Sequence, residues 1–187
     1  MAELTPFNTV GPFFKLLVRD RPEGTDCLVS DATRGERITI TGRLIAGDGA
    51  PVDDGLVEIW QADADGRYHH PGDPNHHEAD PAFTGFGRAA TAAGGAYSFR
   101  TIKPGIVPGP AGERQAPHVL VSVMARGVMS RCWTRMYFEG EPLNETDPVL
   151  QLVAPARRDT VIARRRDQGY EFDIVLQGEG ETVFFEA

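Results

Sequence analysis

The chain has 187 residues, of which 41% are hydrophobic, so it is long enough to bury a sizeable core in one domain. Its 19 basic and 27 acidic residues give a formal net charge of −8, which disfavours a nucleic-acid backbone or an anionic membrane as a partner. The two cysteines, Cys27 and Cys132, are too few for a disulfide scaffold, and the N-terminal residues lack the pattern of a signal peptide. We expect a single domain over residues 1–187, in the cytoplasm, with small molecules or proteins as partners.

An extended arm is expected over residues 1–36. Pro6, Pro12 and Pro22 disfavour both a continuous helix and an interior strand there. Residues 9–14 (TVGPFF) form the one dense cluster, in which a Gly-Pro bend allows close backbone approach and two phenylalanines offer an anchor. The arm either packs on its own domain or reaches another subunit, and the sequence leaves both alternatives open.

The remainder, residues 37–187, is expected to be all-β. In residues 56–60 (LVEIW) apolar side chains alternate at Val57 and Ile59, which predicts a strand with one buried face. The turn at residues 63–66 (DADG) follows, with Gly66 supplying a positive φ, and leads to Tyr68. Further strands are predicted over residues 38–44, 97–101, 118–125, 133–138, 170–177 and 182–185. Short strands between Gly/Pro-rich turns, without a long helical period, predict an antiparallel β-sandwich.

Three segments are expected to be irregular. Residues 69–86 form a long loop, residues 106–115 a Pro/Gly-rich loop, and residues 147–166 a turn or short helix. The arginines of this last segment either form a solvated face or pair with the excess acidic residues. The first loop contains four histidines, at positions 69, 70, 76 and 77. Adjacent side chains diverge in an extended chain, and no cysteine or helical histidine pair accompanies them, so we expect surface histidines rather than a metal site.

Three phrases taken together resemble the intradiol ring-cleavage dioxygenases. They are residues 56–68 (LVEIWQADADGRY), 86–105 (FGRAATAAGGAYSFRTIKPG) and 116–127 (APHVLVSVMARG), within a likeness that spans nearly the whole chain. The closer resemblance is to the alpha chain of the members built from two homologous chains, because single-chain catechol-cleaving members have a helical region before the sandwich. The resemblance implies a β-sandwich and a reaction in which O₂ cleaves protocatechuate to 3-carboxy-cis,cis-muconate.

The resemblance also implies a chain that binds no metal. Family members that hold Fe³⁺ use two tyrosines and two histidines, donors suited to a ferric ion. Tyr68 matches the first tyrosine, whereas Val107 stands at the second; His118 matches one histidine, whereas Leu120 stands at the other. The Fe³⁺ would then lie in a homologous beta chain, forming alpha-beta units that assemble further. Tyr68 is interpreted as a surface hydrogen-bonding residue and His118 as a core histidine in place of ligands.

The resemblance places substrate-binding residues elsewhere, and no catalytic residue in this chain. They are Thr9, Gly11, Pro12 and Arg126, at which an alpha chain reaches into the site shared with the beta chain. A substrate carboxylate gives Arg126 a reason to be there, although it could also be an ordinary turn arginine. Two rival functions remain: a free-standing dioxygenase with an unusual ligand set, and a non-enzymatic β-sandwich binding or structural module.

Overall fold

The computed structural model describes residues 9, 11, 25–109, 111–129, 132–167 and 169–185, and these are almost entirely strands, turns and loops. The strands are β1 (Arg37–Ile45), β2 (Leu56–Gln61), β3 (Phe86–Ala90), β4 (Ala96–Ile102), β5 (Val107–Pro108), β6 (Arg114–Gln115), β7 (His118–Met124), β8 (Cys132–Phe138), β9 (Ile162–Arg166), β10 (Gly169–Glu171) and β11 (Ile174–Val175). The helices are the 3₁₀ turns η1 (His76–Glu78), η2 (Ala93–Gly95), η3 (Pro142–Glu145), η4 (Leu150–Leu152) and η5 (Pro155–Val161). The all-β expectation is confirmed, and no helix in these ranges is long and apolar enough to cross a membrane.

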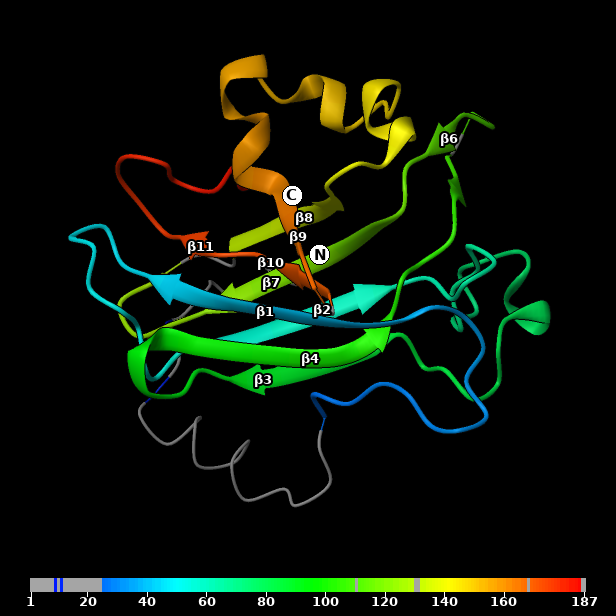
Figure 1. Ribbon diagram of the computed structural model, residues 1–187, viewed down its shortest axis with the longest axis horizontal. Coiled ribbons are helices and arrows are strands. Elements are labelled where there is room, and N and C mark those ends of the chain that lie inside the picture. Colours follow the sequence, from blue (N-terminus) through cyan, green and yellow to red (C-terminus); the bar gives the residue numbers. More distant parts are fainter. Residues whose placement is uncertain are drawn as a thin grey trace, which may run out of the picture.

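One mixed sheet contains nine of the strands. Its order is β3-β2-β7-β8-β9-β10-β1-β4, with β11 beside the last residues of β1, while β5 and β6 form a separate ribbon. The expectation of purely antiparallel pairing is wrong for three pairs, since β1 runs parallel to β10 and β11, and β8 to β9. Between β8 and β9, residues 139–161 with η3–η5 cross one end of the sheet (Figure 1). Such a crossover returns the chain in the same direction and makes parallel pairing possible.

The described end of the predicted arm lies between the two edges of this sheet. Residues 25–28 hydrogen-bond to β3 on one side, where the Arg88 N–H donates to the Thr25 carbonyl (2.8 Å). On the other side the Arg100 N–H of β4 donates to the Asp26 carbonyl (2.9 Å). This part of the arm therefore packs on its own domain and brings the curled sheet close to closure.

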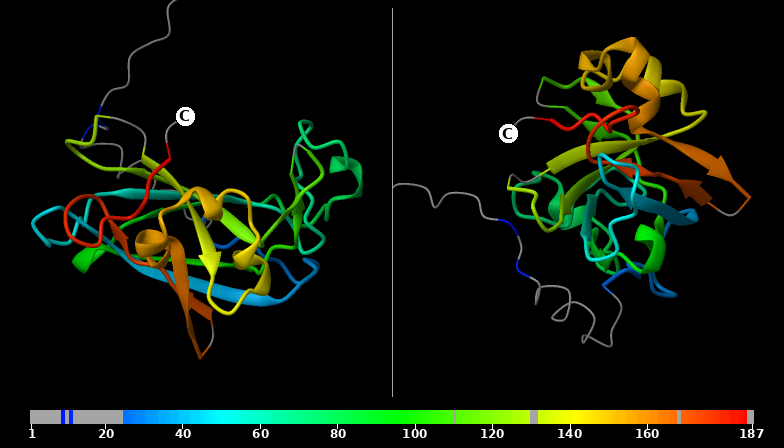
Figure 2. Two further views of the ribbon diagram at one scale, coloured as in Figure 1. Left: turned by 90° about the horizontal axis from the view of Figure 1, so that it is seen from above. Right: turned by 90° about the vertical axis from the view of Figure 1, so that its left-hand side faces the viewer.

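The core lies inside the curled sheet, with β1 and β4 on one side and β2 and β7 on the other (Figures 1 and 2). Val57 and Ile59 are buried there, as their alternation predicts, together with Phe99. A second, smaller cluster lies under η3–η5 and contains Tyr137 and Leu150. Because β7 and β8 contribute side chains to both faces, residues on their outer face are also partly covered.

Several predicted boundaries differ from the structure. The structure contains strand β3, where no strand was predicted, and strand β9, within the segment expected to be a turn or short helix. The loop predicted over residues 106–115 contains the short strands β5 and β6, and the strand predicted over residues 170–177 is divided into β10 and β11. Conversely, residues 182–185 are not a regular strand, although the Phe185 N–H donates to the Trp133 carbonyl of β8 (2.9 Å). The terminal segment thus lies along the sheet through isolated hydrogen bonds rather than a ladder.

Candidate functional site

The turn after β2 positions Tyr68. The Gly66 N–H donates to the Asp63 carbonyl (3.1 Å), and Gly66 has φ of 79°, as the sequence predicts. The buried Asp63 carboxylate accepts from the Arg67 N–H (3.0 Å), which stabilises the turn. Tyr68 then stacks on Trp60 of β2, with ring centroids 5.7 Å apart and an interplanar angle of 17°. The side chain is therefore fixed on the outer face of the sheet.

The same turn brings Val107 beside Tyr68. The Gly105 N–H donates to the Asp63 carbonyl (2.8 Å), so the segment leading to β5 lies directly against the turn. Tyr68 and Val107 both line a cavity of ≈ 680 Å³, with Trp60 and Gln115 also in its wall. We call this cavity the Tyr68 pocket. Two of the four positions that match family iron ligands thus meet at one place.

His118, the third of these positions, begins β7 and is 2% exposed. Its Nδ1 lies 2.7 Å from the Ala116 carbonyl, which can only accept, so Nδ1 carries the proton of the neutral ring. Burial, together with the nearby positive charge of Arg135, lowers the pKa of His118 to about 4. The ring is therefore neutral at pH 7, as expected for a core histidine.

Arg135 of β8 lies beside the Tyr68 pocket, and the sequence analysis did not single it out. It pairs with Leu120 across β7 and β8, and its Nη1 donates to the Gln115 Oε1 of the Tyr68 pocket (2.7 Å). Its buried Nε has no hydrogen-bond partner among the described residues. Burial raises the pKa of the Tyr68 phenol, and the Arg135 charge offsets only part of that rise. One signal was available, since Arg135 is the one charged residue of β8, whose other residues are a threonine and apolar or aromatic residues.

The residues at the matching positions do not fit a ferric ion. Tyr68 and His118 supply two donor atoms, whereas Val107 and Leu120 supply hydrocarbon, and the Arg135 guanidinium opposes a second cation nearby. Nowhere in the described ranges do three or more His, Cys, Asp or Glu side chains form a group that could hold a metal ion. The four histidines of residues 69–77 are exposed.

Arg126 lies in a tight turn between β7 and β8. In this turn, residues 125–128, the Val128 N–H donates to the Ala125 carbonyl (3.2 Å) and Gly127 has φ of 81°, as a type II turn requires. The Arg126 side chain is 64% exposed and forms an ion pair with Asp54 through its Nε. We call residues 125–128 the Arg126 turn.

Thr9 of the arm contacts the Arg126 turn on both sides of the arginine. The Gly127 N–H donates to Thr9 Oγ1 (2.9 Å), and the Thr9 hydroxyl donates to the Ala125 carbonyl (3.3 Å). The structure thus brings together two of the four predicted substrate-binding residues. Gly11 is exposed, with no atom within 4 Å of an added Cβ, and Pro12 lies outside the described residues.

The Tyr68 pocket and the Arg126 turn lie at opposite ends of β7, because β2 ends at Gln61 opposite Val119 and Gln115 of the pocket shortly precedes β7. His118 is the first residue of the strand, and Arg126 follows its last residue, Met124, by two positions. At about 3.3 Å per residue, the eight steps along the chain from His118 to Arg126 separate their backbones by roughly 26 Å. An arginine side chain cannot cover that distance, so Arg126 does not act at the Tyr68 pocket of its own chain.

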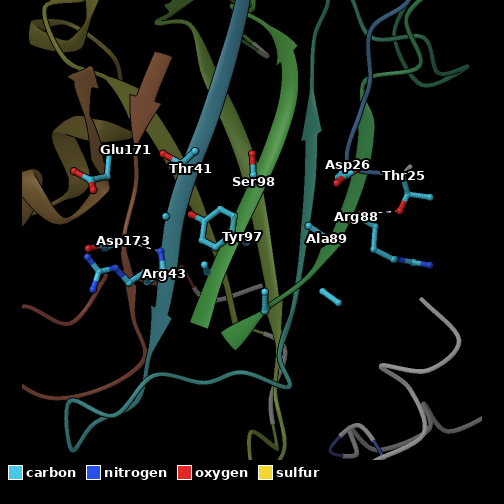
Figure 3. Close-up of a pocket in the computed structure, with 14 residues that line it drawn as sticks. Thr25, Asp26, Thr41, Arg43, Arg88, Ala89, Tyr97, Ser98, Glu171 and Asp173 are labelled. Carbon is cyan, nitrogen blue, oxygen red and sulfur yellow. Dashed lines mark hydrogen bonds between the residues drawn. The ribbon is translucent and has the colours of Figure 1, made fainter. Parts of the chain in front are cut away.

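A second cavity, of ≈ 650 Å³, lies over β1, β3 and β4 (Figure 3). Its polar groups are engaged within the sheet: Arg88 forms an ion pair with Glu58, and the Thr25 hydroxyl donates to the Arg88 carbonyl (2.7 Å). The Asp173 carboxylate accepts from the Arg43 backbone N–H (2.9 Å). These contacts hold strand edges together and bring no set of catalytic or ligating groups into the cavity.

Comparison with known proteins identifies sequence relatives of the whole chain. The profile of a family described as Dioxygenase matches residues 10–178. The protocatechuate 3,4-dioxygenase alpha chain of Pseudomonas putida is 38% identical over 197 aligned residues, covering 97% of this chain and 96% of that one. The beta chain of the Burkholderia cepacia enzyme is 44% identical over 158 aligned residues, covering 79% of this chain and 67% of that one.

Solved structures show the same fold. The dioxygenase domain of a dioxygenase and carbohydrate-binding fusion protein from Streptomyces sp. SirexAA-E superposes with a TM-score of 0.61 at 29% identity, covering 94% of this chain and 99% of that one. Catechol 1,2-dioxygenase from Acinetobacter sp. ADP1 superposes with a TM-score of 0.65 at 21% identity, covering 86% and 60%. The profile match and the full-length relatives agree with the motifs around Tyr68, His118 and Arg126. The chain therefore belongs to the intradiol ring-cleavage dioxygenase family.

Proposed function

We propose that this chain is the iron-free alpha subunit of an intradiol dioxygenase that cleaves protocatechuate with O₂ to 3-carboxy-cis,cis-muconate. A homologous beta chain holds the Fe³⁺, and alpha-beta units assemble further in the cytoplasm. The full-length likeness to a Pseudomonas putida alpha chain supports this assignment. In this proposal residues 37–187 act as one β-sandwich, which is supported by the main core that β1 and β4 share with β2 and β7.

The observation that carries the proposal is the separation of the two sites within one chain. Thr9 and Arg126 come together at the end of β7 that lies away from Tyr68 and His118. Arg126 presents a largely exposed guanidinium, which suits a carboxylate such as that of protocatechuate. In this proposal, groups placed in this way serve a site completed by another chain, to which Gly11 and Pro12 of the arm also contribute.

The Tyr68 pocket has a structural role in this proposal. Tyr68 contributes its stacking on Trp60, and His118 contributes a buried hydrogen bond to the Ala116 carbonyl. The Arg135 guanidinium supplies positive charge close to both of these side chains. Two donors beside hydrocarbon and a cation are a poor environment for Fe³⁺.

Iron analysis of the co-expressed alpha-beta complex tests the proposal. We expect one iron for each pair of chains, and the same value for the Tyr68→Phe variant. A Val107→Tyr, Leu120→His double variant should gain at most weak, sub-stoichiometric iron, because the groups that would orient the new ligands are missing. Two irons for each pair, with one lost on Tyr68→Phe, would show a working metal site in this chain.

Activity assays separate the rival functions. In the complex, Arg126→Ala should weaken protocatechuate binding by about 1–3 kcal/mol, the range for a charge-assisted hydrogen bond, and affect catechol less. A free-standing dioxygenase would instead show ring cleavage and a tyrosinate-to-iron absorption band after iron is added to this chain alone. A binding or structural module would never gain activity with any beta chain.

A further inference from the structure

We propose that Asp54 is a positioning residue that orients the Arg126 guanidinium toward the substrate carboxylate. This inference rests on the function proposed above, and it assigns a role to a residue outside the substrate-binding set. Asp54 forms its ion pair with the Nε of Arg126, and the two side chains differ in exposure, at 24% for Asp54 and 64% for Arg126. The less exposed carboxylate thus holds the Nε of a largely exposed arginine side chain.

The strand pairing brings the two residues to the same end of the sheet. Leu56 of β2 and Met124 of β7 form the last pair of an antiparallel ladder. Asp54 precedes Leu56 by two residues and Arg126 follows Met124 by two, so both lie just beyond the same end of the ladder. The paired strands therefore hold the backbones that carry the ion pair near each other.

The backbone around Asp54 is well fixed. The neighbouring Gly55 N–H donates to the Thr91 hydroxyl (2.8 Å). A Cβ at Gly55 would lie 2.4 Å from the Leu44 Cδ2, so the chain passes close against the core at this point. On the other side, Thr9 bonds to both neighbours of Arg126. Both partners of the ion pair therefore start from restrained backbone, which limits the positions that the guanidinium can take.

The chemistry of the guanidinium explains what this restraint does. The group is planar and presents five N–H donors in a rigid fork. With Asp54 at Nε, the edge formed by the two Nη atoms remains directed away from Asp54 and can donate to both oxygens of a carboxylate. An arginine without this partner would lose more rotamer freedom on binding the substrate. Asp54 also offsets part of the positive charge, so recognition depends on hydrogen-bond geometry as well as on net charge.

Steady-state kinetics of the alpha-beta complex test the inference with Asp54→Ala, Asp54→Asn, Arg126→Ala and the Asp54→Ala, Arg126→Ala double variant. For protocatechuate we expect Asp54→Ala to raise KM about fivefold and leave kcat within about twofold, as for a lost positioning hydrogen bond. The KM for catechol should not change. Asp54→Asn keeps the shape of the side chain and one acceptor oxygen, so its KM for protocatechuate should remain close to the wild-type value. Asp31→Ala, which removes an exposed carboxylate elsewhere, is the matched control and should have no effect.

The double variant decides whether Asp54 acts through Arg126. If it does, Asp54→Ala should cause no further rise in KM once Arg126 is alanine. A rise that persists in that background, an equal rise for catechol, or no rise at all would overturn the role of Asp54. If Arg126→Ala alone leaves the protocatechuate KM unchanged, then Arg126 does not bind the substrate, and the proposed substrate site fails together with this inference. If only Arg126→Ala has an effect, the proposed function stands and the inference about Asp54 falls.

Discussion

His118 should make the stability of this chain depend on pH between about 7 and 4. The ring is 2% exposed, and its pKa is lowered from the ordinary 6.5 to about 4, chiefly by burial. In the unfolded chain the histidine returns to its ordinary pKa and takes up a proton more readily than in the folded chain. The stability associated with the neutral ring is therefore fully present above about pH 6.5 and is lost as the pH falls toward 4.

The size of this effect follows from the two pKa values. At pH 5 an unfolded histidine is almost completely protonated, whereas the folded His118 is still mostly neutral. The difference favours unfolding by about 2 kcal/mol at pH 5 relative to pH 7, and by about 3 kcal/mol once the pH is below 4. Carboxylates also titrate in this range, so the effect must be measured as a difference between variants.

The assay is urea unfolding of the full chain at several pH values, followed by tryptophan fluorescence. His118→Gln removes the titrating ring but keeps an N–H donor for the Ala116 carbonyl, so its stability should fall by about 2 kcal/mol less than that of the wild type between pH 7 and pH 5. His69→Gln, at an exposed histidine, is the matched control and should behave like the wild type. If His118→Gln and the wild type lose stability in parallel, His118 does not govern the acid response and the reasoning from its burial is wrong.

Three further predictions concern the turns and the buried polar contacts. Gly66→Ala should destabilise the chain by several kcal/mol more than Gly49→Ala in thermal unfolding, because both have positive φ but only at Gly66 would a Cβ lie 1.9 Å from a backbone carbonyl. Tyr137→Phe should lower the free energy of unfolding in urea by about 1–3 kcal/mol, since the buried Asp147 carboxylate loses the 2.9 Å hydrogen bond from the Tyr137 hydroxyl. In the alpha-beta complex, Thr9→Val should raise the protocatechuate KM severalfold, whereas Thr9→Ser should not, because only serine keeps the hydroxyl that bonds to the Arg126 turn.

The strands that the sequence predicts well are those rich in their own apolar side chains. The segments at β1, β2 and β4 have apolar residues mainly on one face, and the structure buries that face, whereas β7 and β8 have apolar residues on both faces. By contrast, β3 contains Gly87, where a Cβ would lie 2.6 Å from the Leu28 Cδ1. Because Gly87 leaves room for the Leu28 side chain, β3 lacks the alternating large apolar residues from which a strand is predicted. Likewise, β9 has three arginines in five residues and is held by its neighbours β8 and β10.

Local sequence patterns do not specify whether two neighbouring strands pair in parallel or antiparallel. The hairpin-like pair of β7 and β8 follows from two adjacent apolar segments joined by a short turn. The parallel pairs depend instead on where residues 139–161 carry the chain before β9 begins. Asp147 fixes that path, because its buried carboxylate accepts from the Ala116, Val149 and Leu150 N–H groups. A single aspartate in a polar segment gives no sign of such a role in the sequence.

The positions around Tyr68 show which parts of a site a sequence can predict. Tyr68, Val107 and His118 are recognised because each stands in a family motif, and the structure explains the approach of Tyr68 and Val107 through the turn at Gly66. Arg135 is not part of those motifs, yet its charge acts on both Tyr68 and His118. Tyr68 and His118 each make a contact that depends on their ring, a stack on Trp60 and a hydrogen bond to a carbonyl, whereas Val107 and Leu120 need only fill space. In the iron-free chain that we propose, packing still requires the two ring residues, while the two hydrocarbon positions need not supply a ligand.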